Sequence, residues 1–469
     1  MPNSPLPLPA LLRLCLLLCL AAASPVRAQA PASTPSSAPA STPAATPAAT
    51  APSAPAAASG PARSSFTVRP VDDAWRQGLP RDARAATQAY MDRLPAAVVQ
   101  KSDAYFEGGY WLHLWDFLLG LAIAAGLLHG RWASRLRDLA QRLGRRAWLR
   151  DALFGAAYGV LGSVLSLPLA VYQGYVREHA YGMATQGLGA WAGELLISTA
   201  INTALTAVAV AVLYAIMRRA GTRWWAWGAG AAVAGLAVLV MVGPVLFDPL
   251  FNTYRPVPDG PVKTAVLAMA RANGVPVDQV FVFDASRQTT RVSANVSGLG
   301  RTAAVRLNDN LLLRATLTEI RAVMAHEIGH YTLNHVPKML GQMGLLILLG
   351  FLFADAVMRR LLARHGPRWG VRSASDVASL PLLVAAVSVF MFVATPAFNT
   401  IVRVQEVEAD RFGLNLAREP HGFAEAILKL VEYRKGDPGA LEEVVFFTHP
   451  AARQRIHDAM RWREAMGTP

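Results

Sequence analysis

Six runs of this chain are apolar enough, and long enough, to cross the hydrocarbon core of a bilayer, which takes about 20 residues of helix. The membrane core contains no water that could hydrogen-bond to free backbone N–H and C=O groups. Each run is therefore expected to be a helix, in which these groups pair with one another. A hydrophobic content of 53% and a mean hydropathy of +0.29 exclude an ordinary soluble chain of 469 residues. The sequence therefore predicts a mainly α, polytopic membrane protein whose spans occupy 111–128, 153–172, 195–216, 224–247, 339–358 and 380–398.

The second, third and fourth runs carry no charged side chain, whereas the first and the fifth contain ionisable groups. His113 and Asp116 lie in the first run and Asp355 lies in the fifth. Ionisable groups within a span usually face a protein-lined, watery interior, which is the expectation for these helices. For Asp355, snorkelling near a helix end is an equal alternative.

The N-terminus has the pattern of an export signal. Residues 10–23 form a short apolar stretch, and small residues at 26 and 28 fit a cleavage site, so we predict a signal peptide over 1–28. An uncleaved anchor helix is the alternative. Residues 29–63 are almost entirely Ala, Pro, Ser and Thr, which predicts a disordered linker. Both cysteines, Cys15 and Cys19, fall in the signal, so the mature chain has no disulfide, thiolate metal site or Cys nucleophile.

The arginines between the runs predict the orientation in the membrane. Loops 131–150, 218–223 and 359–372 together hold 15 Arg, whereas the short opposing loop, 173–194, holds one. Only five of the 45 basic residues are Lys, and the +14 net charge is juxtamembrane, so it does not call for a nucleic-acid partner. By the positive-inside rule the Arg-rich loops are cytoplasmic, and residues 248–337 and 399–469 lie on the other side.

The loop after the fourth run contains the clearest chemical motif. His326 and His330 are four residues apart, so one helix face presents both imidazoles to a single zinc ion. Glu327 between them is placed to act on a water molecule at that metal. The motif alone is evidence for a metallopeptidase and not proof of one.

A catalytic zinc needs a third protein ligand, and the segment after the sixth run supplies one. Glu406 and Asp410 are one helical turn apart, so Glu406 can bind the metal while Asp410 accepts the N–H of a ligating His. Glu408 points away from that face and is expected to be a solvated charge. His335 is expected to continue the helix about 140° round its axis as a neighbouring polar or structural residue, with zinc ligation as the alternative.

With these residues in place, the chain resembles the integral-membrane zinc metalloproteases typified by the type 1 CAAX prenyl endopeptidases. The resemblance covers about 105–456 and rests on a series of motifs in order: 109–111, 175–182, 249–258, 293–296, 326–335, 399–410 and 448–455. It implies one zinc held by His326, His330 and Glu406, Glu327 as general base, and a supporting role for Asp410. Two departures are Ala451 after Pro450 and Val404 after Arg403, and neither removes a ligand.

The resemblance also places two residues near the C-terminus beside the zinc. It implies that His449 hydrogen-bonds the tetrahedral oxyanion, and that Arg455 holds either a substrate carboxylate or a carboxylate of the site. Ordinary surface roles are equally open for both.

Short strands are predicted at 279–283, 291–297 and 303–307. By resemblance, the edge strand containing Ala294, Asn295 and Val296 pairs with an extended substrate. A purely structural sheet is the alternative.

These observations predict four regions: a signal peptide over 1–28, a linker over 29–63, a membrane region over 64–247 with four spans, and a small α+β zinc metallopeptidase domain over 248–469 that includes the last two spans. The expected function is cleavage of polypeptides, in processing or quality control of envelope proteins, at the periplasmic side of a bacterial inner membrane. A non-catalytic scaffold of the same fold and an ion or solute transporter are the alternatives; a transporter leaves the zinc motif unexplained.

Overall fold

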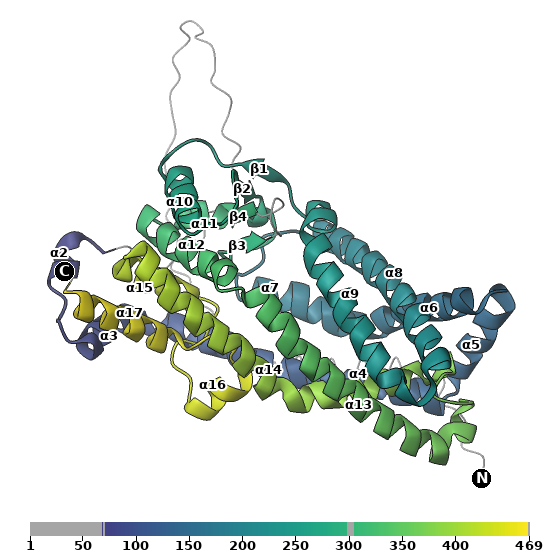
Figure 1. Cartoon of the computed structure of the whole chain (residues 1–469). Helices are drawn as coiled ribbons and strands as arrows, with labels where there is room; N and C mark the ends of the chain where they lie inside the picture. Colours follow the sequence, from purple (N-terminus) through teal and green to yellow (C-terminus); the bar gives the residue numbers. More distant parts are fainter. Residues whose placement is uncertain (1–67, 69–70, 298–303, 468–469) are drawn as a thin grey trace, which may run out of the picture.

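We describe the protein from a computed structural model, which covers residue 68, residues 71–297 and residues 304–467. The predicted signal peptide and the predicted linker both lie outside the described residues. Within them the chain is mainly helical, with one small sheet (Figure 1).

Long apolar helices form the membrane region. Five segments are long and apolar enough to cross a membrane. The sequence predicted six spans, and the difference arises because the third and fourth runs fall in one segment of 59 residues, Leu188–Leu246. That segment bends at a short 3₁₀ turn, where Gly221 has a positive φ of 54° that suits glycine. The helices are α4 (Ala96–His129), α6 (Ala147–Val171), α8 (Leu188–Ala220), α9 (Trp224–Leu246), α13 (His335–Trp369) and α14 (Leu380–Ala417).

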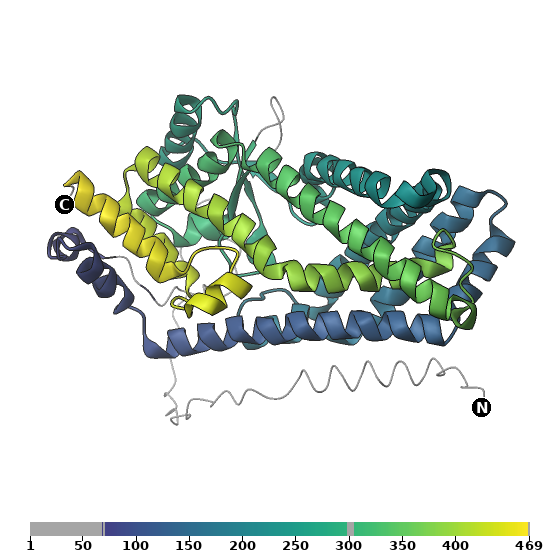
Figure 2. The ribbon, with the colours of Figure 1, turned by 60° about the horizontal axis from the view of Figure 1, so that its bottom comes forward.

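Each predicted run matches one of these helices to within one residue at its end, and most of the helices are longer than the runs. The second continues through a π-helical turn, η1 (Tyr172–Val176), into α7 (Arg177–Ala180). The sixth, α14, continues past the apolar run to Ala417 and so carries residues 399–417 to the functional site. Figure 2 shows α4 extending along one side of the bundle beside α14, and the two helices are in contact.

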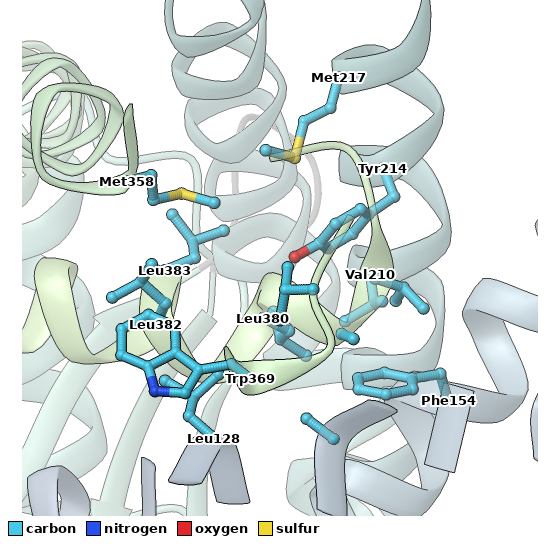
Figure 3. Close-up of a cluster of buried hydrophobic side chains, with 14 of the residues drawn as sticks. Leu128, Phe154, Val210, Tyr214, Met217, Met358, Trp369, Leu380, Leu382 and Leu383 are labelled. Atoms are coloured by element: carbon cyan, nitrogen blue, oxygen red, sulfur yellow. The ribbon is translucent and has the colours of Figure 1, made fainter. Parts of the chain in front are cut away.

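A hydrophobic core ties the end of the membrane region together where α6, α8, α13 and α14 meet (Figure 3). Phe154 and Tyr214 are fully buried in it, and the Tyr214 hydroxyl is 2.8 Å from the Ser379 hydroxyl. Close packing of these side chains and the contact between the two hydroxyl groups support the bundle at this end.

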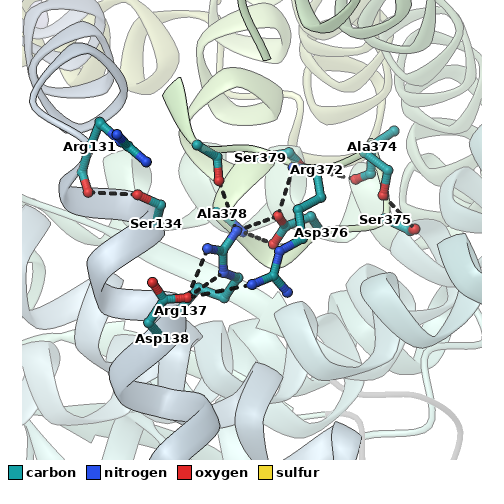
Figure 4. Close-up of polar contacts among 12 residues, drawn as sticks. Arg131, Ser134, Arg137, Asp138, Arg372, Ala374, Ser375, Asp376, Ala378 and Ser379 are labelled. Carbon is teal, nitrogen blue, oxygen red and sulfur yellow. Dashed lines mark hydrogen bonds and ion pairs between the residues drawn. The ribbon is translucent and has the colours of Figure 1, made fainter. Parts of the chain in front are cut away.

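Arg137 fastens the connection between α13 and α14 to the amphipathic helix α5 (Trp132–Leu143), as Figure 4 shows. Its buried guanidinium donates to Asp138, to the Gly370 carbonyl and to Asp376, the last at 2.6 Å. Asp376 also accepts the backbone N–H of Arg372. A buried charge is tolerated only when it is paired and hydrogen-bonded, and this network meets that condition.

At the opposite end, short helices pack into a separate helical cluster. Tyr90, Leu428 and Ile456 are buried in it. It combines segments from both ends of the described chain: α2 (Asp73–Gln77), α3 (Ala83–Met91), α15 (Pro420–Leu430) and α17 (Ala452–Met466), with α16 (Ala440–Phe446) beside them.

A four-stranded mixed sheet lies beside this cluster, in the order β1-β2-β4-β3. The three predicted strands are present as β2 (Val280–Phe283), β3 (Ala294–Ser297) and β4 (Ala304–Asn308), and the sequence analysis missed β1 (Tyr254–Pro256). β3 pairs antiparallel with β4 and stands at one edge. The helices α10 (Pro261–Ala272), α11 (Asp309–Arg314) and α12 (Leu317–Thr332) complete this unit and share its apolar core.

Candidate metal centre

The helix α12 carries both motif histidines on one face. It begins with a capping box, in which Thr316 and Glu319 satisfy each other's free backbone N–H groups. Because His326 and His330 are one turn apart, their Nε2 atoms come within 3.0 Å of each other. The sequence motif therefore fixes this pair without help from the rest of the fold.

The third candidate metal ligand, Glu406, comes from α14. Glu406 Oε2 lies 3.3 Å from His326 Nε2, and Glu406 Oε1 lies 3.5 Å from His330 Nε2. The two helices can approach this closely because Gly413 faces α12. A Cβ at Gly413 would lie 2.9 Å from the backbone nitrogen of His326, closer than real Cβ contacts allow.

These three side chains have the composition and spacing of a metal site. One ligand atom of each lies within 4.8 Å of the others. Glu406 is buried, and its Oε2 atom has no hydrogen-bond partner among the described residues. A buried acceptor without a donor is unfavourable unless a cation balances it, so the donor set fits a metal ion.

Asp410 and Arg455 form a buried support behind His326. Asp410 Oδ1 lies 2.8 Å from His326 Nδ1, on the side of the ring away from Glu406. Arg455 donates to both oxygens of Asp410, at 2.8 and 2.6 Å. Of the two carboxylates that the sequence analysis offered Arg455, the structure pairs it with the one within the site, and its role in substrate binding stays a prediction.

His335 lies differently from the prediction. It does not continue α12, because that helix ends at Thr332 and Asn334 adopts a left-handed conformation with φ of 56°. Asn tolerates this conformation better than most residues. The reversal brings His335 Nδ1 to 2.8 Å from His330 Nδ1, and its Nε2 to 3.1 Å from Glu408. His335 is thus a buried neighbour of the second motif histidine, and Glu408 is a partly exposed charge that contacts it.

Burial shifts the pKa of the acid Glu327 and the pKa values of the imidazoles in opposite directions. Burial raises the pKa of Glu327 to about 7 and lowers the pKa of His330 to about 4. Burial also lowers the pKa of His326, but contacts with Asp410 and Glu406 outweigh it and bring the pKa to about 9. His330 is therefore neutral near pH 7, and Glu327 can exchange a proton there.

His449 lies beside Glu406 and lines the same cavity as His326 and Glu327. Its Nε2 atom is 3.3 Å from Glu406 Oε2, and its Nδ1 atom is 3.0 Å from the Thr448 hydroxyl. Burial, followed by the nearby charge of Arg434, lowers the pKa of His449 to about 3. The ring is thus neutral at pH 7 and can donate through one nitrogen.

The metal centre opens into a cleft that reaches the edge strand. A cavity of about 270 Å³ is lined by His326, Glu327 and His449 together with Ala294. Ala294 and Val296 are partly buried and Asn295 is exposed. The outer edge of β3 has no paired strand among the described residues, so its backbone is open to an added strand beside the cleft.

A larger cavity of about 880 Å³ lies beside the cleft, between α4 and α14. His113 and Asp116 line it, as predicted for polar groups that face a protein-lined interior. Asp355 does not reach it: this side chain is buried, where it accepts the indole N–H of Trp224 at 2.8 Å and pairs with Arg359 at 2.6 Å.

Sequence analysis missed one residue of the site and left another without a role. Arg434 lines the cleft beside His449 and also the large cavity, and no motif or periodicity marked it. Arg403 donates to the backbone carbonyls of Glu443 and Phe447, so it holds the segment that leads to His449.

Comparisons with known proteins agree with this architecture. Residues 256–463 match the model of peptidase family M48, and residues 79–253 match the model described as the CAAX prenyl protease N-terminal region with five membrane helices. The two matches adjoin each other and together span most of the described chain.

The individual relatives have low sequence identity to this chain, but the alignments cover most of its length. The chain is 28% identical over 320 residues to the uncharacterized metalloprotease YhfN of Bacillus subtilis, which covers 68% of this chain and 75% of that protein. It is 25% identical over 413 residues to a CAAX prenyl protease 1 homolog of Arabidopsis thaliana, covering 80% and 92%. The crystal structure of S. mikatae Ste24p superposes with a TM-score of 0.67 at 20% identity, covering 79% of this chain and 90% of that one, which shows a common fold.

Proposed function

This chain belongs to peptidase family M48, among the membrane metalloproteases that include the CAAX prenyl proteases, and from that premise we propose that it is a zinc endopeptidase with Glu327 as general base. The observation that carries the proposal is the buried cluster of His326, His330 and Glu406. Its donor set suits zinc, and Glu327 lines the adjoining cleft.

Zinc held by these three residues would activate a water molecule and polarise the scissile carbonyl group. Glu327 accepts the proton of the attacking water and passes it to the leaving amine, a task suited to a pKa near the working pH. His449 donates from Nε2 to the oxyanion while Thr448 donates to its Nδ1 atom.

Two contacts outside the ligand set fix the histidine tautomers. Asp410 Oδ1 lies 2.8 Å from His326 Nδ1, where it would accept the Nδ1 proton, and Arg455 holds Asp410 in place. His335 does the same for His330: its Nε2–H donates to Glu408, so its Nδ1 accepts the Nδ1 proton of His330. Both ligands then present the Nε2 lone pair to the metal.

The edge strand supports a preference for extended peptides. A peptide added to β3 would pair through its main chain, and such pairing discriminates little between side chains. We therefore propose that the substrates are extended or unfolded segments of envelope proteins. The Arg-rich loops support the proposal that the catalytic side faces the periplasm of a bacterial inner membrane.

The test is zinc content and peptide cleavage by the detergent-purified protein beside its Glu327→Gln variant. The variant is expected to keep one zinc per chain and to lose roughly three or more orders of magnitude in turnover. Normal cleavage by the variant would contradict the role of Glu327. A wild-type protein that binds zinc but cleaves no peptide would favour the non-catalytic scaffold.

A second comparison tests the substrate class. An unprenylated flexible peptide and its prenylated counterpart are expected to be cleaved with similar efficiency, because the features that support binding are main-chain pairing and enclosure. Cleavage of the prenylated peptide alone would replace quality control with a narrower processing role.

A further inference from the structure

Arg434 stands where three cavities of the protein meet. It lines the cleft of about 270 Å³ at the metal centre, the large cavity of about 880 Å³, and a smaller one of about 100 Å³ behind His449. No other residue that the structure describes lines all three. A substrate that passes from the large cavity to the metal centre meets this side chain.

The guanidinium of Arg434 has no carboxylate partner within the described chain, unlike every other basic side chain that lines these cavities. Each of the others lies within 4 Å of a carboxylate: Arg177 and Arg291 pair with Glu178, Lys429 with Glu319, Lys435 with Glu442, and Arg455 with Asp410. Arg434 is partly buried and forms no hydrogen bond or ion pair with a described residue.

The charges around the metal centre leave this cation unbalanced. Glu327, Glu406 and Asp410 contribute three negative charges when ionised, whereas Arg455 and a zinc ion contribute three positive ones. The positive charge of Arg434 is therefore not balanced by a negative charge of the metal centre. A partly buried charge loses hydration, and the loss is recovered when an anion binds to it.

We propose that Arg434 binds a carboxylate of the substrate and so makes this enzyme selective for peptides that carry one near the scissile bond. The inference rests on the proposed peptidase function. The carboxylate belongs either to the C-terminus of the peptide or to an Asp or Glu side chain, since both present the same planar pair of oxygens to a guanidinium.

The position of the edge strand agrees with this role. Ala294 of β3 and Arg434 line the same cleft, so a peptide paired with β3 lies against Arg434 while its scissile bond is at the metal centre. An extended chain advances about 3.3 Å per residue, which places the bound carboxylate within a few residues of the scissile bond.

The experiment compares matched peptides and three variants of the full-length protein in detergent. In a C-terminally amidated peptide with a mapped cleavage site, Asn at each flanking position is exchanged in turn for Asp, and one further peptide has a free C-terminus. A charge-assisted hydrogen bond is worth about 1.5–3 kcal/mol, so the preferred carboxylate is expected to raise kcat/KM roughly 10- to 100-fold, mainly through KM. The Asp series and the free C-terminus show which source is used.

The variants separate a specific contact from a general loss of charge. Arg434→Gln is expected to reduce the preference to less than about twofold, because glutamine offers the carboxylate no charge. Arg434→Lys is expected to retain much of the preference. Arg461→Gln, which removes an exposed charge of α17 outside the three cavities, is expected to behave as wild type.

Peptide dissociation constants measured in the Glu327→Gln background separate the two proposals. A carboxylate preference in binding without any cleavage by the wild type would contradict the peptidase function and support the role of Arg434. Cleavage with no carboxylate preference, or a preference that Arg434→Gln retains, would overturn the role of Arg434 and leave the peptidase function intact.

Discussion

Asp410→Asn removes one charge from a buried triad and tests how much of the metal centre depends on support behind the ligands. Asp410, Arg455 and His326 have side chains that are only 8%, 7% and 9% exposed. Asn keeps the shape of the side chain, but it accepts at one atom only and leaves the guanidinium of Arg455 without a counter-charge.

Two magnitudes follow from this geometry. Removing one partner of a buried ion pair costs about 3–5 kcal/mol of stability, because the remaining charge stays in a site that water does not reach. Loss of the group that orients a ligating His typically weakens metal affinity about 10- to 100-fold. Asp410→Asn is therefore expected to lower both the melting temperature and the zinc affinity.

The assay is a double-mutant cycle read by thermal unfolding and by zinc competition with a chelator. Arg455→Met removes the stranded cation, so the double variant is expected to recover part of the stability that Asp410→Asn loses. Its zinc affinity is expected to stay low, because His326 still lacks its acceptor. If Asp410→Asn changed stability by less than about 1 kcal/mol and zinc affinity by less than twofold, the supporting role of this triad would be refuted.

Three further predictions concern the ligand set, the helix contact and the orientation in the membrane. Glu406→Ala is expected to abolish stoichiometric zinc binding, as measured by metal analysis; full retention would mean that another residue is the third ligand. Gly413→Ala is expected to cost about 1–3 kcal/mol and to weaken zinc binding, because its Cβ would meet the backbone of α12, whereas Gly341→Ala, with open space around it, is the matched control. Reporter fusions after residue 220 and after residue 469 are expected to be cytoplasmic and periplasmic respectively, and the reverse pattern would overturn the orientation.

Much of the architecture follows from local patterns in the sequence. The apolar runs had to become helices, because lipid offers no partner for free backbone groups. The pairing of His326 with His330 needs only the pitch of one helix, and the alternation in 279–307 was enough to place three strands. In each case the decisive interactions join residues that are close in sequence.

The tertiary structure decided what depends on contacts between distant segments. The break after Thr332 turned His335 towards His330, although the periodicity of the motif predicted a continuous helix. Arg455 could have met a substrate or a side chain, and only the packing of α17 against α14 brought it to Asp410.

Arg434 shows the same limit for function. We assign Arg434 a role because it has no carboxylate neighbour among the described residues and lies where three cavities meet. The segments that line those cavities come together only in the folded chain. A sequence specifies which groups are charged, but the fold decides which of them pair, as it does for Arg291 and Glu178, which are far apart in the sequence.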